Sequence, residues 1–206
     1  MQNSRSSTAQ IQPAYLLTFE REMNQTSKFC RIIRMRSKEN KEAIEILFRN
    51  RLYGQVVATL RQELDSMVRC IFLLNIPDLN QREKLISQML EGKRWKNQQN
   101  RIITDRDMVE ISNNLQGWTK SVYKFGCSFI HLSNFHNYRE DDPFESLDNI
   151  EKENIKNHMY YYHGFNLNND LTFDNVKPYL NNVFDKINSN LRCYIDDVEK
   201  EELLIN

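Results

Sequence analysis

The chain has 206 residues, of which 40% are hydrophobic, and its 28 basic and 28 acidic side chains give a net charge of zero at neutral pH. This length and apolar content suffice for one packed core, which excludes a globally disordered chain. Because only five glycines and four prolines interrupt it, we expect a few long helices joined by tight turns.

The sequence shows no sign of export or membrane insertion. It contains no apolar run near the ~18 residues of a transmembrane helix, and the polar segment Met1–Gln12 lacks the basic start and apolar run of a signal peptide. The widely spaced Cys30, Cys70, Cys127 and Cys193 form no C-x-x-C pair, which favours free thiols over disulfides or a zinc site. We therefore expect a soluble, cytoplasmic protein without contact to a membrane.

The neutral total conceals a difference between the two halves. Residues 1–100 carry 17 basic and 10 acidic side chains, whereas residues 101–206 carry 11 and 18. We interpret the halves as electrostatic complements within one fold, and a nucleic-acid-binding patch on the basic half remains the alternative.

The first part of the chain predicts a tail, a short helix and then a long one. Residues 1–13 are expected to be a flexible tail, residues 14–206 a single domain, and Ala14–Met23 a short first helix. A helix from Glu39 to about Asn75 should follow, because apolar residues recur there at alternating intervals of four and three. These residues are Tyr53, Val57, Leu60, Leu64, Met67, Ile71 and Leu74. A shorter helix from Asn80 to Leu90 is expected next.

A second long helix is predicted from Thr104 to Leu132. Thr104 and Asp107 have the spacing of a capping box, and the apolar stripe that follows keeps intervals of three and four. Its members are Met108, Ile111, Leu115, Trp118, Val122, Phe125, Phe129 and Leu132. Gly117 and Gly126 interrupt the helix, which indicates either a bend or the close approach of another backbone.

Two further helices complete an all-α, antiparallel bundle of about four to six helices. One should be capped at Asp148, with Glu151 in its first turn, and closed by Gly164. The last should begin at Asp174 and tolerate Pro178 in its first turn.

The polar face of the predicted Thr104–Leu132 helix carries the main candidate site. Lys120, Lys124, Ser128 and His131 follow one another at intervals of 4, 4 and 3. Since Lys124 and His131 are two helical turns apart, they could hold one phosphate, with His131 as general acid or base and Lys124 stabilising negative charge. The alternative is that His131 caps the carbonyls of its own helix while the lysine stays in solvent.

At these residues the chain resembles the HEPN superfamily of small helical bundles, which includes ribonuclease toxins, abortive-infection effectors and inactive binding members. The resemblance covers about residues 40–200 and depends on the segments Leu60–Leu64 and Tyr123–His131. Family nucleases carry Arg, four to six residues and then His. Here the histidine is His131, but Lys124 stands where the arginine would be, and lysine lacks the planar fork that binds phosphate. The resemblance also implies a homodimer with its active site across the two-fold interface.

Arg61 is a second candidate for the missing guanidinium. It belongs to a polar group with Glu63, Asp65 and Arg69, whose spacing is typical of surface ion pairs. Because the same helix is predicted to be buried, Arg61 could instead face the region of His131 and take part in catalysis.

Candidate RNA-binding residues lie mainly in the basic segment between residues 28 and 41, although a solvated helical face is the more common meaning of such a run. The candidates are Lys28, Arg31, Arg34, Arg36 and Lys120. Neither His131 with His136 nor His158 with His163 has the separation of four residues that places two metal ligands on one helical face, so we expect no metal and no cofactor.

The resemblance implies a HEPN-like protein of a prokaryotic defence or toxin-type system, which would act on RNA as a metal-independent ribonuclease if it is catalytic. The alternative is a non-catalytic helical module that binds a partner effector or antitoxin protein. A third class, a regulatory bundle that binds a small ligand, has no support in the sequence.

Overall fold

The computed structural model describes residues 23–204, so the predicted tail and almost all of the predicted helix Ala14–Met23 lie outside the described residues. Every regular element within this range is a helix, which confirms the all-α prediction. None of these helices is long and apolar enough to cross a membrane.

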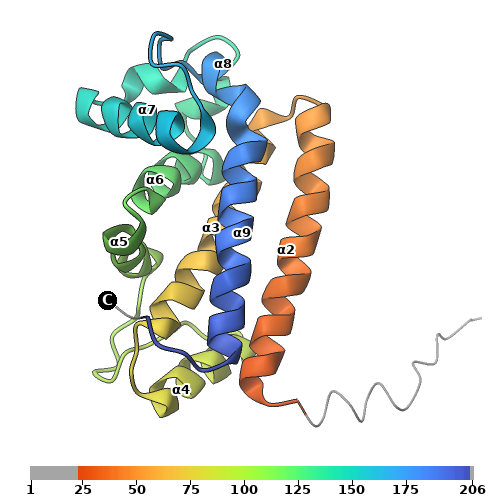
Figure 1. The fold of residues 1–206 in the computed structure, drawn as a ribbon, viewed down its shortest axis with the longest axis vertical. Coiled ribbons are helices and arrows are strands. Elements are labelled where there is room, and N and C mark those ends of the chain that lie inside the picture. Colours follow the sequence, from red (N-terminus) through yellow and green to blue (C-terminus); the bar gives the residue numbers. More distant parts are fainter. Residues whose placement is uncertain (1–22, 205–206) are drawn as a thin grey trace, which may run out of the picture.

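Three long helices form the centre of the fold (Figure 1). They are α2 (Gln25–Arg49), α3 (Tyr53–Leu74) and α9 (Leu180–Glu199), and each contacts the other two. Helix α3 lies in the middle and has 15 buried residues among its 22, as expected for a helix covered on all sides.

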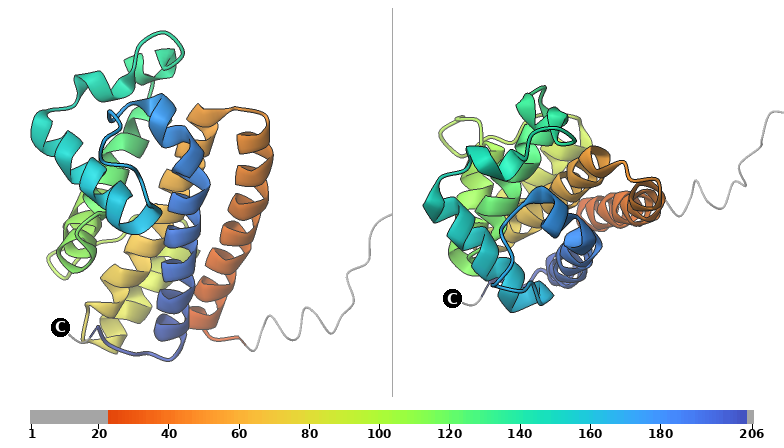
Figure 2. Two further views of the ribbon diagram at one scale, coloured as in Figure 1. Left: turned by 45° about the horizontal axis from the view of Figure 1, so that its top comes forward. Right: turned by 90° about the horizontal axis from the view of Figure 1, so that it is seen from above.

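A second group of helices covers the side of α3 that faces away from α2, as the view from above shows (Figure 2). Helices α5 (Asp105–Gln116) and α6 (Thr119–Ile130) pack on α3, and α7 (Asn149–His163) packs on α6. Helix α4 (Leu79–Leu90) contacts α2. The remaining short elements are the 3-10 turns η1 (Asn134–Asn137), η2 (Pro143–Ser146) and η3 (Lys177–Tyr179) and the helix α8 (Phe173–Val176).

The predicted helix from Glu39 to Asn75 is divided in two. Helix α2 starts earlier, at a cap in which the Asn24 side chain accepts a hydrogen bond from the Ser27 amide, and it ends at Arg49. Arg51 then adopts a left-handed φ of 58°, and α3 returns antiparallel to α2. No glycine or proline stands at this turn, so the sequence lacks the usual signal of a helix end.

The predicted helix from Thr104 to Leu132 is also divided, at Gly117. The capping box of Thr104 and Asp107 is present, and Gly117 ends α5 with a φ of 75°. Gly126 has a different role, because a Cβ atom built on it would lie 2.7 Å from the Arg61 Cβ. Both glycines thus differ from the prediction. Gly117 ends α5 instead of bending one long helix, and the atoms that approach Gly126 belong to the Arg61 side chain of α3 and not to a backbone.

The ends of α7 agree with the prediction. The Asp148 side chain accepts a hydrogen bond from the Glu151 amide, and Gly164 closes the helix with a φ of 71°. The final helix differs, because Pro178 lies in η3, and this turn separates α8 from α9.

A buried polar cluster joins α2, α3 and α9. Glu63 has no exposed surface and accepts hydrogen bonds from Ser37 Oγ at 2.5 Å, Asn40 Nδ2 at 2.8 Å and Asn188 Nδ2 at 3.0 Å. The prediction of a surface ion pair is thus wrong for Glu63, whose partners are all neutral. Since a buried charge is tolerated only when its hydrogen bonds are made, this cluster fixes how the three helices align.

The contact at Gly126 gives a direct test of the packing of α3 on α6. We expect Gly126→Val to lower the free energy of unfolding by about 1–3 kcal/mol, because the new side chain overlaps Arg61. Denaturant unfolding followed by circular dichroism measures this. The control Asn114→Val, at an exposed helical position, should lower the free energy of unfolding by less than about 1 kcal/mol. Equal effects of the two changes would contradict the close approach.

Candidate functional site

The polar face predicted on α6 borders a hollow between α6 and α7. This outer hollow has a volume of about 340 Å³, and its polar lining comprises Ser121, Lys124, Ser128, Ser146 and Glu151. Lys124 Nζ forms an ion pair with the Glu151 carboxylate. Two of the predicted catalytic residues, Lys124 and Ser128, are therefore neighbours, and the cation is already paired with an acid.

His131 lies outside this lining. Helix α6 ends at Ile130, and His131 is its C-cap with extended backbone angles, φ −93° and ψ 147°. Its side chain is exposed, and its carbonyl oxygen lies 3.2 Å from His136 Nε2. Because the helix stops before His131, the two-turn spacing from Lys124 does not determine the direction of the imidazole.

Arg61 is buried and directed toward α5 and the middle of α6. Its guanidinium lies 4.1 Å from the centre of the Tyr123 ring and forms ion pairs with Asp65 and, at 3.6 Å, with Asp105. Burial alone would lower the pKa of Arg61, but the charge of Asp65 and its hydrogen bond raise it overall. Tyr123 and His131 are about 12 Å apart along the α6 axis, at ~1.5 Å per residue, so the guanidinium does not reach His131 within one chain.

The predicted RNA-binding residues are dispersed over α2 and α6, and several have acidic partners. Arg34 pairs with Asp196 at 2.8 Å and Glu199 at 2.6 Å, and these carboxylates raise the pKa of Arg34, with the largest effect from the hydrogen bond that Arg34 donates to Glu199. Lys120 pairs with Glu110 at 2.7 Å. These pairs support the interpretation that basic and acidic segments complement each other within the fold. The remaining candidates, Lys28, Arg31 and Arg36, also lie on α2.

The segment that follows His131 in the sequence is acidic. Residues 131–154 contain seven acidic and two basic side chains, whereas residues 91–106, which connect α4 to α5 and include the first two residues of α5, contain five basic and two acidic ones. A negative segment repels the phosphates of a nucleic acid, and a positive one attracts them. The electrostatics therefore disfavour RNA binding at His131 in a single chain.

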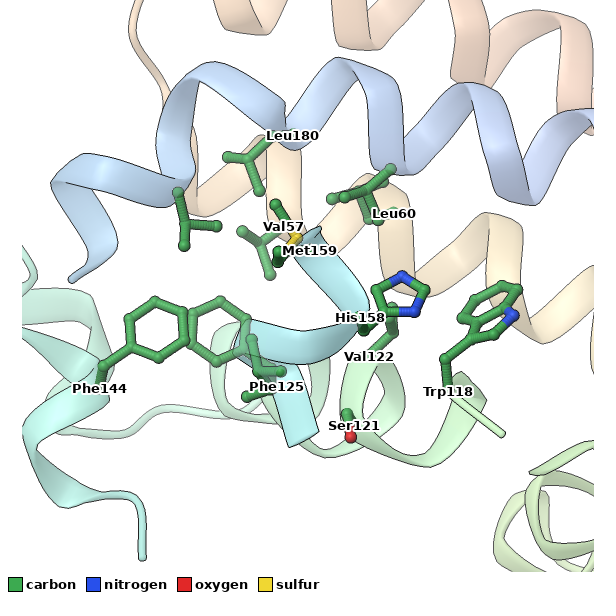
Figure 3. Close-up of a pocket in the computed structure, with 13 residues that line it drawn as sticks. Val57, Leu60, Trp118, Ser121, Val122, Phe125, Phe144, His158, Met159 and Leu180 are labelled. Atoms are coloured by element: carbon green, nitrogen blue, oxygen red, sulfur yellow. The ribbon is translucent and has the colours of Figure 1, made fainter. Parts of the chain in front are cut away.

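A second, inner cavity was not foreseen from the sequence. It has a volume of about 60 Å³ and lies among α3, α6, α7 and α9, with an almost wholly apolar lining that includes Leu60, Trp118 and Val183 (Figure 3). Ser121, Phe125 and Ile155 line both this cavity and the outer hollow, so the two spaces adjoin.

One titratable residue, His158, stands in the wall of the inner cavity. Its ring nitrogens are buried and have no hydrogen-bond partner among residues 23–204. Burial, and secondarily the charges of His163 and Lys186, lower the pKa of His158 to about 3, so its imidazole is neutral at physiological pH. In the same range no group of His, Cys, Asp and Glu side chains is arranged to hold a metal ion.

Comparison with known proteins adds no assignment: no family model, curated protein or solved structure matches this chain.

The buried imidazole predicts a loss of stability in mild acid. The pKa of His158 is lowered from 6.5 to about 3 in the fold, so below pH 6.5 the unfolded chain takes up a proton that the folded chain does not. We expect His158 to reduce the free energy of unfolding by at most about 2 kcal/mol between pH 6.5 and 5.

Unfolding in urea across this pH range measures the effect. His158→Phe should reduce the dependence on pH, while Tyr161→Phe, at an exposed position of the same helix, should retain that of the wild type. An unchanged slope in His158→Phe would show that the imidazole is not buried in its neutral form.

Proposed function

We propose that this chain is a non-catalytic helical interaction module that binds a partner protein at the end of α6. The observation that carries the proposal is Leu132, which directly follows α6 and its cap and is 97% exposed. Ile130, two residues earlier, is 46% exposed. Burying one such side chain in a complex contributes about 1.5–3 kcal/mol, so this point can act as an anchor for a partner.

The acidic segment that follows Leu132 in the sequence indicates the chemistry of that partner. With seven acidic and two basic side chains in residues 131–154, it complements an apolar pocket that has a rim of lysine or arginine. Long-range attraction of this kind speeds association and excludes acidic partners. The resemblance to HEPN proteins supports the same proposal, because that superfamily includes members that bind an effector or antitoxin without catalysis.

The candidate catalytic groups support binding over chemistry. Lys124 is paired with Glu151, Arg61 is paired with Asp65, and His131 lies at a helix end beyond both pairs. A general acid or base must lie within hydrogen-bond reach of a shared reacting group, and these three side chains do not converge on one point in a single chain.

A photo-crosslinking side chain at position 132 tests this proposal in the native cell, with Glu45 of α2 as a matched exposed control position. We expect one protein to be crosslinked from position 132 and not from position 45. With that protein purified, Leu132→Asp should weaken binding at least tenfold, which corresponds to about 1.4 kcal/mol. If Leu132→Asp binds as tightly as the wild type, the anchor is assigned wrongly.

A metal-independent ribonuclease is the second candidate, favoured by the position of the exposed His131 between the exposed Ile130 and Leu132. Two-fold pairing of two chains over these apolar residues would bring two imidazoles together and shield them from water. The composite site that the HEPN resemblance implies would then form between the copies.

The ribonuclease candidate requires a dimer in light scattering and cleavage of labelled single-stranded RNA without added metal. His131→Ala should then lower the rate by about 10²–10⁴, and Lys124→Arg should retain it, because arginine keeps the charge and adds a planar fork. A monomer at tens of micromolar, or equal cleavage by wild type and His131→Ala, would exclude this candidate.

A further inference from the structure

The outer hollow and the inner cavity together have the form of a site for a small amphiphile. Ser121, Phe125 and Ile155 belong to the lining of both, so these three side chains form the boundary between the outer hollow and the apolar cavity. Figure 3 shows Ser121 and Phe125 on α6, with Leu60 and Leu180 on the opposite side of the cavity. A molecule that passes between these three side chains can place a polar head in the outer hollow and an apolar tail in the inner cavity.

The inner cavity limits the tail to a few atoms without charge. A volume of about 60 Å³ corresponds to roughly four to six water-sized positions, since each needs ~10–15 Å³. The walls are contributed by apolar side chains such as Val57, Val183 and Met159, and His158 presents a neutral ring. A branched or linear side chain of about four heavy atoms matches this space.

The outer hollow presents both signs of charge to the head group. Lys124 and Glu151 line it as an ion pair, with side chains 56% and 28% exposed. Ser121 lines both spaces, and its hydroxyl, which makes no hydrogen bond to residues 23–204, points away from the inner cavity (Figure 3).

The head must match both charges. An anion alone would pair with Lys124 but leave Glu151 unpaired beside a second negative charge. A cation alone would pair with Glu151 but leave Lys124 unpaired beside a second positive charge. A head that carries one carboxylate and one ammonium replaces the internal ion pair with two new ones. No charge then remains uncompensated.

We propose that the two adjoining spaces bind a free aliphatic α-amino acid of the size of leucine, isoleucine or methionine. Its carboxylate pairs with Lys124, its ammonium with Glu151, and its side chain enters the inner cavity past Ser121. This site is separate from the protein-binding anchor, since Leu132 lines neither space.

Calorimetry and tryptophan fluorescence measure binding on the purified full chain. Trp118 lines the inner cavity and Trp95 does not, so a Trp95→Phe background leaves Trp118 as the only tryptophan and a local reporter. We expect leucine to bind and to change the emission of Trp118. Alanine, which has too small a tail, should bind at least tenfold more weakly.

Two analogues test the head group separately. The acid 4-methylpentanoate lacks the ammonium of leucine, and 3-methylbutylamine lacks its carboxylate. We expect both to bind at least tenfold more weakly than leucine. Equal binding of either analogue would overturn the assignment of a zwitterionic head.

Protein variants test where the ligand lies. Lys124→Gln and Glu151→Gln should each weaken leucine binding at least tenfold, and Ser121→Leu should abolish it by closing the junction. Val183→Phe provides a second block from the α9 side, with its fold checked by circular dichroism. Leu132→Asp is the control and should bind leucine as the wild type does, which separates this proposal from the protein-binding one.

The proposal fails if leucine, isoleucine and methionine all fail to bind the wild type at 10 mM. At this concentration a Kd of about 1 mM would give ~90% occupancy. It also fails if leucine binds a folded Ser121→Leu or Val183→Phe variant as tightly as the wild type.

Discussion

The buried carboxylate of Glu63 is the constraint on which the arrangement of the long helices depends. It has no exposed surface, and its hydrogen-bond donors are Ser37 and Asn40 on α2 and Asn188 on α9. A hydrogen bond to a charged group contributes about 1.5–3 kcal/mol, whereas an unpaired buried charge costs several. A shift of either neighbouring helix along α3 would break these bonds, so the apolar contacts supply most of the stability and the polar cluster selects one alignment.

Helix α3 also positions the neighbouring helices α5 and α6. Arg61, two residues before Glu63, packs against Gly126 and thereby sets the distance between α3 and α6. Its ion pair with Asp105 reaches the start of α5, so one buried guanidinium positions both helices. The place of Arg61 in this packing explains why it is buried and gives it a structural role that needs no substrate.

The charge asymmetry of the sequence has two consequences in the fold. Some opposite charges neutralise each other across helices, as Arg34 does with Asp196 and Glu199. Others remain segregated along the sequence, because residues 131–154, which begin next to the exposed Leu132, carry seven acidic and two basic side chains. The proposed protein partner with a basic rim complements this charge, whereas the phosphates of a nucleic acid are repelled by it.

The sequence by itself determined the helical class, most of the helices and several of their ends. Capping at Thr104 and Asp148 and the left-handed glycines Gly117 and Gly164 are local effects, and local effects can be predicted from short segments. The end of α2 at Arg49 was missed because the left-handed residue after it, Arg51, is an arginine and leaves no such signature. Tertiary structure alone decided that Glu63 is buried among neutral donors, that Lys124 pairs with Glu151 and that His131 stands apart from both. Each of these contacts joins residues at least 23 positions apart or depends on where a helix stops, and helical periodicity contains no information about such neighbours.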